Sequence, residues 1–140
     1  MKLVVDASVA LKWILGSVQT EPDLAAAATL LKTLGDGVHT ALQPIHWQAE
    51  IMAVVARTAP LRIDGTLVLL SQTPFIIIDN VTVLRRAATM SASLGHHLFD
   101  TLYHALALEA DAILITADVA YARKSQHLGH IELLSSLPST

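Results

Sequence analysis

The sequence predicts an α/β fold, with a parallel sheet flanked by helices on both faces. Short apolar segments alternate along the chain with longer segments of helical periodicity, an order that produces a parallel sheet with right-handed crossovers. The first segment, Lys2–Ser8, contains an apolar β-branched run without polar alternation, as expected for a strand buried on both faces. This strand ends in Asp6, which places a carboxylate at the sheet edge where α/β folds bind ligands.

The composition indicates one domain, spanning residues 1–140, with part of its surface covered by another chain. A length of 140 residues suits a single core, and 53% hydrophobic residues are sufficient to fill it. A mean hydropathy of +0.53 with only 15% charged residues is unusually apolar. We therefore expect a second copy or a tight partner to cover apolar surface.

Charge and segment lengths exclude several classes of protein. No apolar run reaches the ~18 to 20 residues that a membrane span needs, so we expect no membrane association. The sequence enters its first strand without the regions of a signal peptide, and it has no cysteine, so we expect a cytoplasmic protein. The net charge of −3 argues against a generally basic protein that coats nucleic acid, although it allows a local basic patch.

The first third of the chain continues with two helices. A helix begins at Val9, and either Ser8 or Asp6 is expected to cap it. Gly16–Pro22 is expected to be a loop, followed by an alanine-rich helix over Asp23–Leu34 that glycines after Leu34 end.

The next pair of elements carries a second acid. Val38–Leu42 is a weak strand, and Ile45–Arg57 has helical periodicity, with Pro44 expected in the first turn of that helix. The apolar positions of the helix are Trp47, Ile51, Val54 and Val55. Glu50 lies close to this apolar stripe, so we expect a half-buried acid.

The remaining sequence alternates three strands with four helices. The strands are predicted at Phe75–Asp79, Ala112–Asp118 and Ile131–Leu134. The helices are predicted at Leu61–Gln72, Val81–Leu94, Leu98–Glu109 and Tyr121–Ser125. The packed face of Leu98–Glu109 is expected to consist of Leu102, Ala105, Leu106 and Leu108. Asp100 lies in the first turn of this helix, and Ala112–Asp118 ends in an acid as the first strand does.

These positions predict a cluster of carboxylates at one edge of the sheet. Asp6 and Asp118 end strands, Asp100 begins a helix, and Glu50 is the natural fourth member. Clustered carboxylates repel one another unless they share protons or bind a cation. Oxygen ligands favour Mg²⁺ or Mn²⁺ over zinc, and such a site suits the hydrolysis of a phosphodiester by a metal-activated water.

Each acid also has a simpler interpretation, which the sequence leaves open. Asp100 would interact favourably with the helix dipole at that position, and Asp118 would serve as an N-cap. Asp6 has the same N-cap alternative. Glu50 taken alone is typical of a solvated helix residue.

The segments around the acids resemble the four acidic motifs of PIN-domain ribonucleases, in particular VapC-type toxins of toxin–antitoxin pairs. The matching segments are Val4–Trp13, Glu50 in the third helix, Phe99–Ala107 and Leu114–Asp118. The resemblance extends from Leu3 to about Leu134. One position departs from the family pattern: many relatives carry Asn one turn after the glutamate, where this chain has Ala53.

The resemblance implies a PIN fold, a parallel sheet of about five strands flanked by helices. It implies that Asp6, Glu50, Asp100 and Asp118 surround one or two Mg²⁺ or Mn²⁺ ions. Thr116 would lie beside them, with its hydroxyl either holding a ligand or contacting the ion through a water molecule. It further implies endonucleolytic cleavage of RNA by a metal-activated water. A cognate VapB-like antitoxin that blocks the site, and a homodimer, are the partners it implies.

Histidine spacing does not predict a structural zinc site. His46 and His104 each lie one helical turn from an acid, and His96 is adjacent to His97, but no tetrahedral set of ligands is evident. One position considered for His97 and His104 is the border of the acidic pocket, in contact with RNA phosphate. We expect instead that they lie at the surface or support a ligand from behind.

Local positive charge identifies candidates for RNA binding. Lys12 and Arg123 each follow a candidate ligand, on the helices that lead away from Asp6 and Asp118. A net-acidic protein needs such local cations to contact phosphate groups.

Three other functions are compatible with parts of the pattern. The first is a non-catalytic PIN-like module for dimerisation or RNA binding. The second is a phosphate-handling α/β protein with Asp6 as nucleophile, but that pattern requires Asp two residues later, where this chain has Ser8. The third, a Ser-His-Asp hydrolase, lacks the G-x-S-x-G turn.

Overall fold

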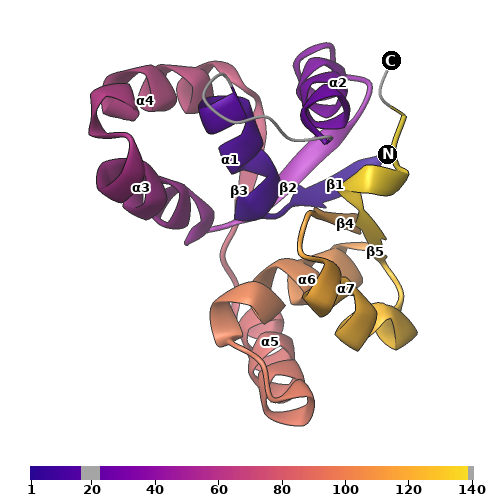
Figure 1. Cartoon of the computed structure of the whole chain (residues 1–140). Coiled ribbons are helices and arrows are strands. Elements are labelled where there is room, and N and C mark those ends of the chain that lie inside the picture. Colours follow the sequence, from indigo (N-terminus) through magenta and orange to yellow (C-terminus); the bar gives the residue numbers. More distant parts are fainter. Residues whose placement is uncertain (17–22, 139–140) are drawn as a thin grey trace.

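A computed structural model describes residues 1–16 and 23–138, so residues 17–22 of the predicted loop lie outside it. Five parallel strands form one sheet in the order β3-β2-β1-β4-β5 (Figure 1). The strands are β1 (Lys2–Val5), β2 (Thr40–Pro44), β3 (Phe75–Ile78), β4 (Ile113–Thr116) and β5 (Ile131–Leu133). The predicted α/β fold with a parallel sheet is confirmed.

The helices begin and end close to their predicted positions. They are α1 (Ala7–Leu15), α2 (Leu24–Gly35), α3 (Trp47–Thr58), α4 (Ile63–Gln72), α5 (Val81–Leu94), α6 (Leu98–Ala110) and α7 (Val119–Ser125). Short 3₁₀ turns lie at η2 (Pro60–Arg62), η3 (Gln126–Leu128) and η4 (Leu134–Ser136). Across both described ranges, every helix is too short or too polar to cross a membrane.

The central strand β1 is buried on both faces, as predicted. Val4 and Val5 point to opposite faces, and neither is exposed to solvent. Val5 packs with α2 in one apolar cluster, whereas Val4 packs with α3, α5 and α6 in another. Helices therefore cover both faces of the sheet (Figure 1).

The start of β2 differs from the prediction. The N–H groups of Val38 and His39 donate to the carbonyl of Thr33, so both residues belong to the turn after α2. The strand begins at Thr40 instead. Pro44, which was expected in the first turn of the next helix, is the last residue of β2 and pairs in register with Ile78. A proline is tolerated there because the missing N–H costs little at the end of a strand.

The strand β3 is an edge strand, although its apolar sequence resembles that of the buried β1. Among the described strands it pairs with β2 alone, and Ile76 and Ile77 are 50% and 44% exposed. An apolar run predicts a strand but does not reveal whether a neighbouring strand covers it.

The buried side chain of Gln43 completes the pairing of β1 with β2. Its Nε2 donates to the carbonyl of Val5 at 2.8 Å, and its Oε1 accepts from the N–H of Val5 at 2.8 Å. On the other side of β1, the N–H of Asp6 donates to the carbonyl of Ile115 at 3.0 Å. The backbone that carries Asp6 is therefore fixed between β2 and β4.

We expect Gln43→Met to lower the free energy of unfolding by about 2 to 4 kcal/mol, because it leaves two buried backbone groups of Val5 unpaired. Urea denaturation followed by circular dichroism measures this loss. The matched control is Gln48→Met on the exposed surface of α3, which should stay within about 0.5 kcal/mol of the wild type. Equal stability of the two variants would contradict the assignment.

Candidate metal centre

Three of the four predicted acids follow a strand directly or lie on the helix after it, whereas Asp100 lies on α6, which follows α5. Asp6 directly follows β1, and Asp118 follows β4. Glu50 is in the first turn of α3 after β2, and Asp100 is in the first turn of α6. The carboxyl ends of parallel strands share one edge, so segments far apart in sequence meet there (Figure 1).

Asp6 is the acid most strongly affected by its surroundings. Its pKa is raised above the ordinary value by burial, lowered by hydrogen bonds from Thr116 and Ser8, and raised further by the charges of Asp100 and Glu50. Asp100 and Glu50 therefore both lie within electrostatic range of Asp6. Like charges at short range destabilise the ionised form.

Two hydroxyl groups hold one oxygen of Asp6. Thr116 Oγ1 donates to Asp6 Oδ2 at 2.7 Å, and Ser8 Oγ donates to the same atom at 2.9 Å. The expectation that Ser8 caps α1 is wrong, because the helix begins at Ala7 and Asp6 occupies the N-cap position without a side-chain cap bond. Ser8 therefore lies inside the first turn and points back to Asp6.

Glu50 is half-buried, as predicted, with 36% of its side chain exposed. Tyr103 Oη donates to Glu50 Oε2 at 2.7 Å, and His46 Nε2 lies 3.0 Å from the same oxygen. Burial, and then the contact with Glu50, raises the pKa of Tyr103. Tyr103 therefore remains a neutral hydroxyl donor.

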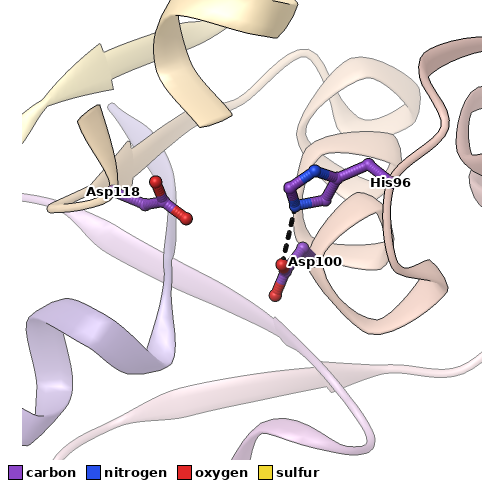
Figure 2. A group of neighbouring side chains, drawn as sticks. All are labelled: His96, Asp100 and Asp118. Atoms are coloured by element: carbon purple, nitrogen blue, oxygen red, sulfur yellow. Dashed lines mark hydrogen bonds and ion pairs between the residues drawn. The ribbon is translucent and has the colours of Figure 1, made fainter. Parts of the chain in front are cut away.

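Asp100 and Asp118 face each other across the edge, with His96 beside them (Figure 2). One ligand atom from each of the three side chains lies within 4.8 Å of the others. His96 Nε2 is 2.8 Å from Asp100 Oδ2, and His96 Nδ1 is 3.3 Å from Lys124 Nζ. A lysine ammonium only donates, so Nδ1 accepts and Nε2 carries the proton that is donated to Asp100.

Asp118 caps α7 and is also linked to Asp6. Its Oδ1 accepts from the N–H of Tyr121 at 3.0 Å, as the simpler interpretation anticipated. Its own N–H donates to Thr116 Oγ1 at 3.0 Å. The hydroxyl of Thr116 thus connects Asp118 with Asp6.

The four carboxylates share one pattern. Each has one oxygen held by protein donors, and within the described residues no hydrogen bond reaches the other. The second oxygens are Asp6 Oδ1, Glu50 Oε1, Asp100 Oδ1 and Asp118 Oδ2. A set of oriented carboxylate oxygens with little neutralising charge fits a hard divalent cation such as Mg²⁺ or Mn²⁺.

His104 lies neither at the border of the acidic pocket nor at the surface, two of the positions considered for it. His104 is fully buried; its Nδ1 accepts from Tyr121 Oη at 3.0 Å, and its Nε2 donates to the carbonyl of Gly129 at 2.7 Å. Burial lowers its pKa, so it serves as a neutral core residue. His97 is exposed at the N-cap of α6.

His96, rather than His104, is the histidine that contacts Asp100, and the sequence held a signal for it. The two histidines lie four residues before and four residues after Asp100, so spacing alone did not separate them.

The predicted packed face of α6 was also incomplete. Leu102 and Leu108 are only half-buried, whereas Tyr103 and His104 are fully buried.

The two predicted RNA-binding residues lie on the helices that follow Asp6 and Asp118. Lys12 is half-buried on α1, and Arg123 is exposed on α7, where it lines a hollow with Val119 and Glu132. Lys124, the basic residue next to Arg123, approaches the acids through His96.

The PIN domain family model matches residues 3–126 of the chain. The fold is shared with the structure of VapBC2 from Rickettsia felis bound to a DNA fragment from its promoter, at a TM-score of 0.71 and 17% identity over 95% of this chain and 98% of that one. A toxin–antitoxin complex from Klebsiella pneumoniae has a TM-score of 0.68 and 14% identity, over 94% of this chain and 97% of that one. VapBC-1 from nontypeable Haemophilus influenzae has a TM-score of 0.67 and 14% identity, over 97% of this chain and 100% of that one. No curated protein matches the sequence.

We expect Asp6→Asn to raise the melting temperature of the chelator-treated protein at neutral pH. The raised pKa of Asp6 means that its contribution to stability is present below its unfolded pKa and is lost as pH rises through its folded pKa. Asparagine retains the carbonyl that accepts from Thr116 and Ser8 but carries no charge.

A gain of about 2 to 4 °C is expected, the shift that roughly 1 kcal/mol produces in a domain of this size. Thermal unfolding at several pH values measures it, and the gain should shrink at acidic pH, where wild-type Asp6 is protonated. Asp64→Asn, at an exposed position in the first turn of α4, is the control. A gain equal to that of the control would contradict the assignment.

Proposed function

The chain belongs to the PIN domain family, and from this premise we propose that it is an Mg²⁺- or Mn²⁺-dependent endoribonuclease. Asp6, Glu50, Asp100 and Asp118 would hold one or two ions, and Thr116 would support them. The observation that carries the proposal is the pattern of four carboxylates at one edge, each with one oxygen held and one left for a ligand. Hydrolysis of an RNA phosphodiester is the chemistry that such a site favours.

The chain's own residues would orient the reacting groups. A bound divalent ion would activate a water molecule and offset negative charge on the phosphate oxygens. Thr116 and Ser8 fix Asp6, and His96 fixes Asp100, so less side-chain freedom is lost when substrate binds. Lys124 adds a positive charge beside His96 at the rim of the cluster, where a phosphate group would approach.

We further propose that this nuclease is a VapC-type toxin that acts in the cytoplasm, forms a homodimer and is blocked by a cognate VapB-like antitoxin. Large apolar side chains are exposed on several elements, in agreement with the expected cover by another chain. They include Ile45, Leu61, Ile76, Val81 and Phe99. Expression of the chain with and without the product of a neighbouring antitoxin gene, scored for growth arrest, tests this role.

The alternative is a non-catalytic PIN-like module that dimerises or binds RNA. Calorimetric titration with Mn²⁺ separates the two functions, because a scaffold has no need for metal at the acidic cluster. Heat of binding that Asp6→Asn removes would support the nuclease. Its absence in the wild type would favour the scaffold.

We expect Asp118→Asn to slow Mg²⁺-dependent cleavage of single-stranded RNA at least about 100-fold, because it removes a charged ligand from the site. The amide oxygen can still accept from the N–H of Tyr121, so α7 should remain capped. Product formation on end-labelled RNA measures the rate, and thermal unfolding verifies the fold. Asp79→Asn is the matched control, since Asp79 also follows a strand but is exposed after β3. A fully active Asp118→Asn variant would exclude this mechanism.

We expect Lys12→Ala and Arg123→Ala each to weaken RNA binding about 3- to 10-fold and to reduce its salt dependence, because each removes one phosphate contact. Fluorescence anisotropy of labelled RNA at several salt concentrations, with the Asp118→Asn background to prevent cleavage, measures the effect. Arg57→Ala, an exposed position on α3, is the control. Unchanged affinity and salt slope would remove these residues from the RNA path.

A further inference from the structure

We propose that His46 and Tyr103 are positioning residues that hold Glu50 at the metal centre, a task that no side chain on the following turn of α3 performs. The inference rests on the proposed function, because it treats Glu50 as a metal ligand. It concerns how this chain orients that ligand, and its test measures metal binding without RNA.

Two polar groups from different elements contact one oxygen of Glu50. Tyr103, on α6, donates its hydroxyl to Oε2 at 2.7 Å. His46, one turn before Glu50, places Nε2 at 3.0 Å from the same atom. Both contacts are therefore made by Oε2, and Oε1 is the oxygen left for a cation.

The contacts of His46 determine which of its nitrogens carries the proton. Nε2 lies 3.0 Å from Glu50 Oε2 and 2.9 Å from the carbonyl oxygen of Phe99. Both partners only accept, so Nε2 is the protonated nitrogen. Nδ1 is buried and, among the described residues, has no hydrogen-bond partner. The single N–H of a neutral imidazole makes its hydrogen bond to the carbonyl of Phe99, so His46 offers Glu50 a close polar contact rather than a second hydrogen bond.

The imidazole of His46 is itself held in place. Its ring centroid lies 5.4 Å from that of Phe99 and 4.8 Å from that of Tyr103. Phe99 directly precedes Asp100, so the bond from His46 to the Phe99 carbonyl ties α3 to the first turn of α6. One side chain thus links the backbone next to Asp100 with the carboxylate of Glu50.

The departure at Ala53 gives these contacts their importance. Many PIN relatives carry a polar Asn one turn after the glutamate, whereas the methyl group of Ala53 is exposed and cannot hydrogen-bond. A glutamate side chain that is free to rotate loses about 1.5 to 2 kcal/mol of entropy when it is fixed. The hydroxyl of Tyr103 on α6 and the imidazole of His46 on the preceding turn fix it before the metal binds.

The experiment is a titration of Mn²⁺ into each variant, with the signal of free Mn²⁺ followed by electron paramagnetic resonance and the fold verified by thermal unfolding. Tyr103→Phe and His46→Ala should each weaken Mn²⁺ binding about 10- to 100-fold, the range typical of residues that orient a metal ligand. His46→Gln, whose side-chain amide also donates, should recover most of the loss. Thr66→Val is the matched control, because it removes a buried hydroxyl that donates to the carbonyl of Arg62 rather than to Glu50.

A double-mutant cycle separates positioning from a general structural effect. In a Glu50→Ala background, Tyr103→Phe and His46→Ala should cause no further loss of Mn²⁺ affinity, because both act through Glu50. Further loss in that background, or wild-type affinity in the two single variants, would overturn the positioning role and leave the proposed nuclease standing. Absence of Mn²⁺ binding in the wild type would overturn both.

Discussion

The burial of a carboxylate beside others at the carboxyl edge of the sheet is the constraint on which the rest of this structure depends. Burial, with a smaller contribution from the charges of Asp100 and Glu50, raises the pKa of Asp6. The donors that reach the four acids are hydroxyl groups, an imidazole and a backbone N–H. Such donors orient a carboxylate but supply little positive charge. Asp6 is therefore held in place and electrostatically strained at once, a state that the proposed divalent cation would relieve.

The packing around the edge serves to keep the carboxylates in place. At the end of β1, the side-chain amide of Gln43 pairs with the backbone N–H and carbonyl of Val5 in place of a backbone group of β2. Thr116 joins the loops after β1 and β4, and Tyr103 reaches from α6 to α3. These contacts come from fully buried residues, so the geometry of the edge is coupled to the core rather than to mobile surface side chains.

Periodicity and strand ends were enough to predict the fold class and the edge at which the acids meet. They were insufficient where the outcome depends on which neighbour a segment finds. The apolar run of β3 did not reveal its place at the edge of the sheet, and Pro44 suits a strand end as well as a helix start. The two histidines spaced equally around Asp100 are distinguished only by packing, which buries His104 and leaves His96 facing the acid.

The hydrogen bond between Thr116 and Asp6 spans 110 positions along the chain. Contacts of such wide separation form late, since a long loop must close first. During synthesis, the N-terminal strand and its acid leave the ribosome well before β4 does, so an emerging polypeptide has no assembled centre. In the proposed nuclease, Asp6 and Asp118 therefore come together only when nearly the whole domain has been made.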